Sequence, residues 1–255
     1  MPVAVRERLK SVKSLVPHGT RLLDVGSDHA ALPISLFSGN MITGAVISDI
    51  NEKPLQRAKN EAAKTVFFDK CTFVLSDGFD RIDPDSFDVA AICGMGGTLI
   101  SSMIERGISD GRLKKEHVLI VQPMTDIYVV RKCLWDNGYR ITDEIFSVEG
   151  KYDSDPAKNR ARPYVVIKAE YSGIKCGYSV SDLFFGKIRG DDTAFLCFKE
   201  KTMRMLSNKL KGILISLKAE RQDKKRKYYA DAGLKKLCAL RKKPFKDHLR
   251  KKLLK

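Results

Sequence analysis

The feature that most constrains the fold is an alternation, between Arg21 and Gln122, of short apolar runs with longer stretches compatible with helices. An uninterrupted apolar run predicts a strand buried on both faces, and such strands need helices on both sides of their sheet. The alternation therefore predicts a parallel sheet with crossover helices. The five strands predicted are Arg21 to Val25, Gly44 to Ile50, Thr72 to Ser76, Asp88 to Cys93 and His117 to Gln122.

Helices are predicted before and between these strands. The stretch Val3 to Leu15 has an apolar side, and Pro17 and Gly19 end it. The crossover helices predicted are Ala30 to Phe37, Lys53 to Val66, Gly97 to Arg106 and Asp126 to Asn137.

A different order follows the fifth strand. Tyr139 to Val148 and Pro163 to Tyr171 both read as strands, and no helix separates them. Two such strands predict an antiparallel hairpin at the edge of the sheet. The predicted fold class is α/β, with five parallel strands plus an antiparallel edge hairpin over residues 1–171, an arrangement typical of class I, Rossmann-like methyltransferases.

The last part of the chain has a helical pattern. Residues 172–186 are predicted to be a linker, and residues 187–255 a helical hairpin or coiled-coil module with a second helix at Ala230 to Arg241. One apolar stripe supports the first helix: Phe195, Phe198, Met205, Leu206, Leu210, Ile213, Leu214 and Leu217.

Charge is distributed unequally between the two parts. Residues 1–186 hold 24 basic and 24 acidic side chains, whereas residues 187–255 hold 23 basic and 7 acidic ones, so the whole excess of +16 belongs to the module. Lysines on a helix often form only a solvated surface. The one-sided excess favours instead a module that follows a phosphate backbone, and Lys224, Lys225, Arg226 and Lys227 are candidate contacts to RNA.

Other partners and sites are not indicated. No apolar run is long enough to span a bilayer and the first residues lack a signal peptide's apolar core, so a cytoplasmic protein without a membrane partner is expected. The six cysteines and four histidines are scattered, which predicts neither disulfides nor a metal site. A monomer is expected, and a dimer through the helical module stays open.

The turn after the first predicted strand is a candidate cofactor site, with Asp24, Gly26, Ser27, Asp28 and His29. It lacks the second and third glycines of a dinucleotide fingerprint, and Asp28 would repel a pyrophosphate. A cationic sulfonium cofactor, S-adenosylmethionine, suits these carboxylates better. The alternative is an ordinary turn in which Ser27 and Asp28 cap the next helix.

Acids also end the second and third predicted strands. Asp49, followed by Ile50, stands where nucleotide-binding sheets place an acid for the ribose hydroxyls, and Asp77-Gly78 stands where a carboxylate can accept from an adenine amine. Alone, Asp49 could cap a helix and Asp77-Gly78 could be a turn. Acids at the carboxyl ends of three consecutive strands favour a ligand site, because open α/β sheets bind their ligands there.

The fourth strand is followed by the glycine-rich run Gly94-Met95-Gly96-Gly97. Each glycine costs a helix start about 1 kcal/mol relative to alanine, which favours a close approach of the backbone to cofactor or substrate. Asn or Asp, two prolines and an aromatic, which exocyclic amino-group methyltransferases carry here, are missing. Cys93 lacks the context of a covalent nucleophile and is interpreted as a small buried residue.

Three segments together resemble the bacterial tRNA (adenine(22)-N1)-methyltransferase family, TrmK, from the Arg8-Leu9 helix to Tyr171. The matching runs are Asp24-x-Gly26-Ser27-Asp28-His29-x-x-Leu32-Pro33, Gly94-Met95-Gly96-Gly97-Thr98-Leu99-Ile100 and Gln122-Pro123. The resemblance implies S-adenosylmethionine as methyl donor, a coiled-coil C-terminus, and methylation of N1 of an adenine in the D-arm region of tRNA. Met124 departs from the family, which usually has Asn there, and residues 153–162 are longer and more basic.

The resemblance and the motifs together assign roles. Asp28 is the candidate catalytic residue, since a carboxylate near the adenine amine would stabilise the positive charge that forms on the base; contact with the cofactor alone is the alternative. Arg8, Gln122 and Pro123 are candidate substrate contacts. Rival hypotheses are methylation of another RNA and a non-catalytic protein that binds S-adenosylmethionine and RNA. The cofactor-binding residues expected are Asp24, Gly26, Ser27, Asp28, His29, Asp49, Ile50, Asp77, Gly78, Gly94, Met95, Gly96 and Gly97.

Overall fold

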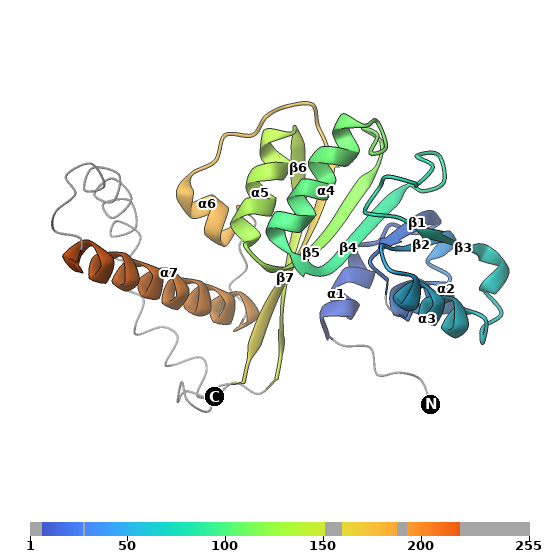
Figure 1. Ribbon diagram of the computed structural model, residues 1–255, viewed down its shortest axis with the longest axis horizontal. Helices are drawn as coiled ribbons and strands as arrows, with labels where there is room; N and C mark the ends of the chain where they lie inside the picture. Colours follow the sequence, from blue (N-terminus) through green and yellow to red (C-terminus); the bar gives the residue numbers. More distant parts are fainter. Residues whose placement is uncertain (1–6, 28, 151–159, 188–192, 220–255) are drawn as a thin grey trace. The chain divides into compact units, whose positions relative to one another are not determined.

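A computed structural model describes residues 7–27, 29–150, 160–187 and 193–219, with the side chains of residues 214–219 left out. The chain divides into two compact units, Met1–Tyr178 and Ser179–Lys255. The first unit contains a seven-stranded sheet in the order β3-β2-β1-β4-β5-β7-β6 (Figure 1). The predicted class I methyltransferase arrangement is confirmed by this order and by the pairing of the strands.

Strands β1 to β5 are parallel and correspond to the five predicted strands. They and the hairpin strands have these bounds: β1 Thr20–Val25, β2 Ile42–Asp49, β3 Cys71–Leu75, β4 Val89–Gly96, β5 Val118–Thr125, β6 Tyr139–Glu149 and β7 Arg162–Tyr171. β7 pairs antiparallel with β5 and with β6, so the predicted antiparallel edge hairpin is confirmed.

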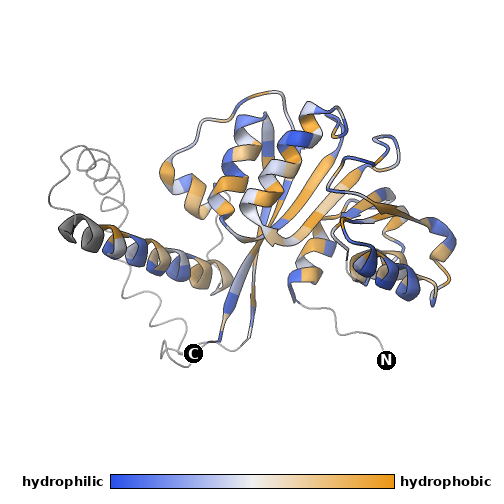
Figure 2. Cartoon of the chain, viewed as in Figure 1, coloured by the Kyte–Doolittle hydropathy of each residue, from blue (hydrophilic) through white to orange (hydrophobic). Residues whose placement is uncertain are grey.

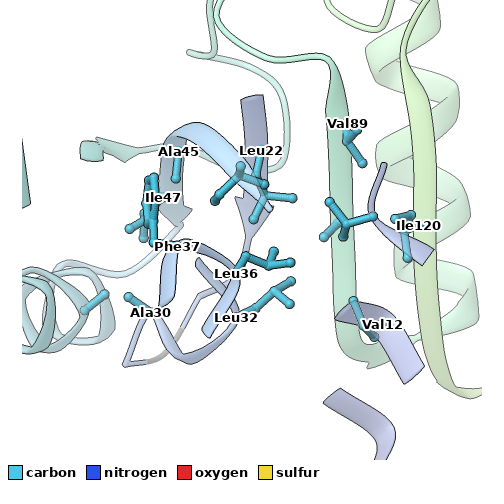
Figure 3. Packing of buried hydrophobic residues seen from close by; sticks show 14 of the residues in the cluster. Val12, Leu22, Ala30, Leu32, Leu36, Phe37, Ala45, Ile47, Val89 and Ile120 are labelled. Carbon is cyan, nitrogen blue, oxygen red and sulfur yellow. The ribbon is translucent and has the colours of Figure 1, made fainter. Parts of the chain in front are cut away.

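Helices cover both faces of the sheet, as strands with buried side chains on both faces require. Their bounds are α1 Glu7–Leu15, α2 Ala31–Ser38, α3 Glu52–Ala62, α4 Gly97–Ser109 and α5 Ile127–Asp136. Helices α1, α2 and α3 contribute to one buried apolar cluster, in which Val12, Leu36 and Leu22 come from two helices and a strand (Figure 3). Helices α4 and α5 pack together and contact β4, β5 and β6. Figure 2 shows apolar strands between helices that carry polar outer sides.

Helix α3 ends earlier than predicted. The expected end was Val66, but the helix ends at Ala62 and a short 3-10 helix follows at Phe68–Lys70. The hydroxyl of Thr65 donates to the Ala62 carbonyl at 2.7 Å and accepts from the Phe67 N–H at 3.2 Å. Such local bonds between a threonine side chain and the backbone compete with continuation of the helix.

The second unit begins with a short helix inside the segment that was expected to be a linker. Helix α6 spans Val180–Phe185, and Ser179 caps it: its hydroxyl accepts from the Asp182 N–H at 3.2 Å while Asp182 accepts from the Ser179 N–H at 2.9 Å. This reciprocal pair is a capping box.

The long helix predicted after the linker is α7, Thr193–Ala219. Phe195, Phe198 and Leu206 of the predicted stripe are buried, but Met205 and Ile213 are 40% and 44% exposed, so these two do not belong to the buried side. Thr202 lies on that side instead. The predicted second helix, Ala230 to Arg241, and with it any coiled-coil pairing, lies outside the described residues.

Candidate active site

Five turns meet at one edge of the sheet, because β1 to β5 are parallel and adjacent. They follow the carboxyl ends of β3, β2, β1, β4 and β5 in that spatial order (Figure 1). The chain moves outward in one direction from β1 to β3 and in the other from β4 to β5. Open α/β sheets bind ligands at such a switch point, here between β1 and β4. The predicted cofactor residues that the structure describes end strands, lie in turns or, in the case of Gly97, begin the next helix at this edge.

The first turn has a strained backbone. Gly26 has φ +73°, and the non-glycine residues His29 and Ala30 have φ +72° and +50°. The N–H groups of Gly26 and Ser27 donate to the Ser48 carbonyl of β2 at 2.8 and 3.1 Å. The N-cap residue of α2 is Ala30, which makes no side-chain capping hydrogen bond, so among the described residues Ser27 does not hold the capping position of the alternative interpretation. Left-handed non-glycine residues of this kind concentrate at functional sites.

The carboxylate of Asp24 lies beneath this turn. Its side chain is buried at 6% exposure, and burial raises its pKa to about 6, an effect that a hydrogen bond with Ser27 partly opposes. The charged form is therefore costly in the folded protein. A carboxylate kept in such a place is a candidate for binding a cationic ligand.

Asp49 ends β2 and is 9% exposed. Its Oδ1 accepts from the N–H of Asn51, which precedes α3, at 2.8 Å. The carboxylate thus also supports the helix start, as the alternative interpretation expected. Ile50, next in the chain, is 60% exposed and leaves an apolar surface beside the carboxylate.

Asp77 and Gly78 form the turn after β3, and Gly78 has φ +58°. Arg106 of α4, which the sequence did not indicate, holds this turn: its Nη2 lies 3.0 Å from Asp77 Oδ1 and 3.1 Å from the Asp77 carbonyl. Its Nε lies 3.0 Å from Asp80 Oδ1. Arg106 and Asp77 are distant in the sequence, and no local sequence pattern indicates such a pair.

The glycine-rich run Gly94 to Gly97 has two kinds of glycine. Gly94 has φ +80° and lies at an irregularity in the pairing of β4 with β5. Gly97 begins α4, and a Cβ there would lie 2.6 Å from the Thr125 carbonyl oxygen and overlap that of Asp126. Glycine is thus required at position 97 because the backbone of Thr125 and Asp126 passes close to it. The prediction that a purely structural role would be too costly an explanation is wrong for this glycine.

Met95 connects the first and fourth turns. A Cβ built on Gly26 would overlap Met95 Cε, so the methionine methyl lies directly against the glycine. Cys93, just before the run, is only partly buried and packs against the apolar cluster, and burial and the nearby Asp24 carboxylate hold the pKa of its thiol well above the usual value. The protonated thiol agrees with the interpretation of Cys93 as a packing residue.

The fifth turn brings the predicted substrate residues together. Gln122 is buried and its Nε2 donates to the Pro123 carbonyl at 3.2 Å and lies 3.6 Å from Met124 Sδ. Arg8 of α1 places Nη1 3.5 Å from the same sulfur. Arg8 is also the neighbour of Gly94, because a Cβ there would lie 4.0 Å from Nη1.

Two residues near Arg8 were missed in the sequence. The Arg8 guanidinium lies 5.9 Å from the ring centre of Tyr164, and the Arg8 N–H lies 3.4 Å from Glu149 Oε1. They come from β7 and β6, so only the hairpin's position at the sheet edge could have indicated them. Asp28 and the four cations from Lys224 to Lys227 lie outside the described residues.

Two other kinds of site have no candidate in the parts that the structure describes. No cluster of three or more His, Cys, Asp or Glu side chains suited to a metal ion occurs among those residues. None of their helices combines the length and apolar character that crossing a membrane requires.

Known proteins are similar to this chain in fold and in sequence. Residues 5–152 match a family model described as a methyltransferase domain. The tRNA (adenine(22)-N(1))-methyltransferase of Bacillus subtilis (strain 168) is 31% identical over 184 residues, 72% of this chain and 72% of that protein. The structure of the B. subtilis m1A22 tRNA methyltransferase TrmK matches with a TM-score of 0.73 at 25% identity, covering 92% of this chain and 96% of that one. A Streptococcus pneumoniae protein described as a tRNA (m1A22) methyltransferase, in complex with S-adenosyl-L-methionine, matches with a TM-score of 0.70 at 31% identity, covering 83% and 94%. The chain therefore belongs to the tRNA (adenine(22)-N(1))-methyltransferase family.

Proposed function

We propose that this protein transfers a methyl group from S-adenosyl-L-methionine to N1 of adenine 22 of tRNA, the reaction named for its B. subtilis relative. The observation that carries the proposal is the position of Asp24, Asp49 and Asp77 in or directly after three neighbouring strands, β1, β2 and β3, at one edge of the sheet. Asp24 suits the cationic methionine part of this cofactor, while Asp49 and Asp77 stand where carboxylates can accept from ribose hydroxyls and from an adenine amine.

The described residues fit this cofactor. Gly26, with φ +73°, keeps the first turn free of a side chain. Asp49 Oδ1 is engaged by the chain, and within the described part of the protein Oδ2 has no hydrogen-bond partner, which leaves it for a ribose hydroxyl. Asp77 Oδ2 is available in the same sense for an adenine amine. The same residues were expected from the sequence to bind the cofactor, together with Ser27, Asp28, His29, Ile50, Gly78 and Gly94 to Gly97.

When bound, S-adenosylmethionine supplies an electrophilic methyl group, which the N1 lone pair of adenine can attack without a strong general base. The protein has to align the base, exclude water and stabilise the positive charge that develops on it. We assign that last role to Asp28, whose carboxylate would also accept a proton from the amine of the cationic product. Contact with the methionine part of the cofactor is the alternative role for Asp28.

The substrate side of the site is proposed at the ends of β4 and β5. Met124 follows Pro123, and the Arg8 guanidinium and the Gln122 amide both direct an N–H group at its thioether. A thioether is a weak acceptor. The two donors are therefore suited to leave the thioether and bind the stronger acceptors of a nucleotide. Met124, which is 43% exposed, offers an apolar contact to a base.

Capture of the tRNA is proposed for residues 187–255, which carry the whole excess of 16 positive charges. Lys224, Lys225, Arg226 and Lys227 are the contacts proposed to its phosphates. We further propose that the protein acts as a monomer in the cytoplasm, where its substrate is found; light scattering of the purified protein tests the monomer.

A methyl-transfer assay tests the function. The purified protein is incubated with methyl-labelled S-adenosylmethionine and an unmodified tRNA transcript, and the labelled nucleotide is mapped. The matched control is the same transcript with guanine at position 22, which should take up no label. Label at another position would replace the proposed target, and methylation of other RNA but not tRNA would favour the rival substrate class. Binding of cofactor and RNA without transfer would favour a non-catalytic protein.

The role of Asp28 needs its own measurement. Asp28→Ala should lower the single-turnover rate of methyl transfer by at least about 100-fold, the usual contribution of a positioned catalytic group. Its affinity for S-adenosylhomocysteine should change by no more than a few fold. A rate close to wild type would contradict the catalytic role, and a large loss of affinity with a normal rate at saturation would favour the cofactor contact.

A further inference from the structure

The turn after β3 is held by one side chain from another element. Arg106, in the last turn of α4, contacts Asp77 twice, at Oδ1 (3.0 Å) and at the backbone carbonyl (3.1 Å), and contacts Asp80 Oδ1 with its Nε at 3.0 Å. A planar guanidinium that uses several donors at once fixes the orientation of its acceptors. Arg106 therefore sets both the path of the turn and the direction of the Asp77 carboxylate.

The turn is also packed against α4 at Gly78. A Cβ at Gly78 would lie 3.1 Å from Met103 Cγ and 3.5 Å from Arg106 Nη2. The Ser76 hydroxyl closes the turn from the other side, since it donates to the Gly78 carbonyl at 3.2 Å and accepts from the Arg81 N–H at 3.1 Å. The carboxylate of Asp77 thus projects from a turn with a fixed backbone.

Among the described residues, one oxygen of this carboxylate has a partner and the other has none. Arg106 binds Oδ1, and no residue that the structure describes supplies a partner to Oδ2. Asp77 is 39% exposed and Arg106 37%, so both are accessible at the sheet edge where the cofactor is proposed to bind. A carboxylate held through one oxygen presents the other in a defined direction, which suits an N–H donor of a ligand.

We propose that Arg106 is a positioning residue that makes the site selective for the 6-amino group of the cofactor's adenine, by holding Asp77 so that Oδ2 accepts from that amine. This inference rests on the proposed function, because it assumes an adenosyl cofactor at this edge. It assigns to Arg106 an effect on the adenine amine alone, and none on the rest of the cofactor.

A comparison of two ligands in two variants tests the proposal. The ligands are S-adenosylhomocysteine and its analogue with hydrogen in place of the 6-amino group, and their dissociation constants are measured by calorimetry. The variants are Arg106→Gln, which cannot make the three contacts, and Arg21→Gln as the matched control. Arg21 forms a similar exposed pair with Asp88, 2.6 Å apart, and also donates to the Asp85 carbonyl, but it lies at the opposite end of β1.

The expected result is a loss of selectivity. Wild type and Arg21→Gln should bind S-adenosylhomocysteine about tenfold more tightly than the analogue, the effect of one hydrogen bond to a charged acceptor. Arg106→Gln should bind S-adenosylhomocysteine about tenfold more weakly than wild type, with its affinity for the analogue within about twofold. Equal weakening for both ligands would show a merely structural role and would overturn the proposal, as would unchanged affinity for both.

A second variant keeps the proposal testable if Arg106→Gln does not fold. Asp80→Asn removes the charge that anchors Arg106 Nε and leaves Arg106 and Asp77 in place, so it should reduce the selectivity in the same direction. If Arg106→Gln does not unfold cooperatively, unchanged selectivity in Asp80→Asn would overturn the proposal. A wild-type protein that methylates tRNA but binds both ligands equally would reject this inference while the proposed function stands. A wild-type protein that binds neither ligand would reject the proposed function.

Discussion

Arg131 Nε donates to Glu144 Oε1 at 2.7 Å, and both side chains are fully buried. The pair joins α5 to β6, the outermost strand of the hairpin, within the methyltransferase unit. An ion pair in this environment contributes little compared with apolar side chains of the same size, but loss of one partner leaves a buried charge. Its presence therefore makes the attachment of the hairpin sensitive to single substitutions.

Removal of one partner should destabilise the protein strongly. Glu144→Leu leaves the Arg131 guanidinium buried without its carboxylate, and the free energy of unfolding should fall by about 3 to 5 kcal/mol. The double variant Arg131→Met with Glu144→Leu should recover most of that loss. Urea denaturation measures both, and a single variant as stable as wild type would contradict the burial of the pair.

The unusual carboxylate of Asp24 predicts opposite effects on stability and binding. Its pKa is about 6 in the folded protein, against an ordinary value of 3.8, so the ionised form opposes folding at neutral pH. Asp24→Asn should raise the free energy of unfolding by about 1 to 3 kcal/mol at pH 8. Its affinity for S-adenosylmethionine should fall, because the negative charge is lost.

The gain in stability from Asp24→Asn should itself depend on pH. Between pH 6 and pH 4 the folded wild type binds a proton at Asp24 that the unfolded chain does not, so wild type becomes relatively more stable as the pH falls. The stability advantage of Asp24→Asn should therefore shrink from pH 8 to pH 5, as followed by urea denaturation. An advantage that grows over this range would show that burial does not raise the pKa of Asp24.

The crossing at Gly97 predicts a severe effect of one methyl group. Gly97→Ala places a Cβ against the carbonyl oxygens of Thr125 and Asp126, and backbone atoms cannot move away as a side chain can. We expect a loss of several kcal/mol in unfolding free energy, at the upper end of single substitutions. Gly212→Ala in α7 is the control, since a Cβ there meets nothing within 4 Å and alanine favours a helix by about 1 kcal/mol. Thermal unfolding followed by circular dichroism separates the two outcomes.

Arg8 should act on tRNA and not on the cofactor. Arg8→Ala removes the guanidinium beside Met124 and Gly94, and we expect kcat/KM for tRNA to fall about tenfold, as when one charge-assisted hydrogen bond is removed. The dissociation constant for S-adenosylhomocysteine should stay within about twofold. Lys10→Ala on the same helix, an exposed residue paired with Glu7, is the control and should leave both unchanged. Weaker binding of S-adenosylhomocysteine with an unchanged kcat/KM for tRNA would contradict this prediction and would place Arg8 in the cofactor-binding part of the site.

The basic module predicts a change in salt dependence. Replacing Lys224, Lys225, Arg226 and Lys227 by Gln should weaken tRNA binding and reduce the slope of log affinity against log salt by about 0.7 for each phosphate that the variant no longer neutralises. Filter binding between low and moderate salt measures the slope. If the slope of the variant equals that of wild type, these four cations belong to a solvated surface and tRNA binds elsewhere.

Local patterns were sufficient to predict the sheet and the five turns that follow the carboxyl ends of its parallel strands. Apolar runs such as Leu22-Leu23 and Val89 to Ile92 are buried on both faces, and burial on both faces is what their apolar composition predicts. The ends of elements were predicted less well, because they depend on single side chains, as Thr65 shows at the end of α3.

Contacts between distant residues could not be predicted in the same way. The need for glycine at position 97 arises from the Thr125 and Asp126 carbonyls, and the role of Arg106 arises from Asp77. Such contacts depend on which turns the topology brings together, and neither propensity nor periodicity contains that information. The stripe on α7 was partly wrong for a related reason: a regular spacing of apolar residues does not show that each one is covered, and Met205 is exposed.

The contact of Met95 with Gly26 also provides a spectroscopic probe. A methyl group carried on sulfur rotates freely and gives a sharp NMR signal, and this one lies against the turn proposed to receive the cofactor. Labelling the methionine methyl groups with carbon-13 would let the chemical shift of Met95 report any rearrangement of that turn. Because Met95 belongs to β4 and Gly26 follows β1, this resonance would report ligand-induced changes at the place where the two strands meet.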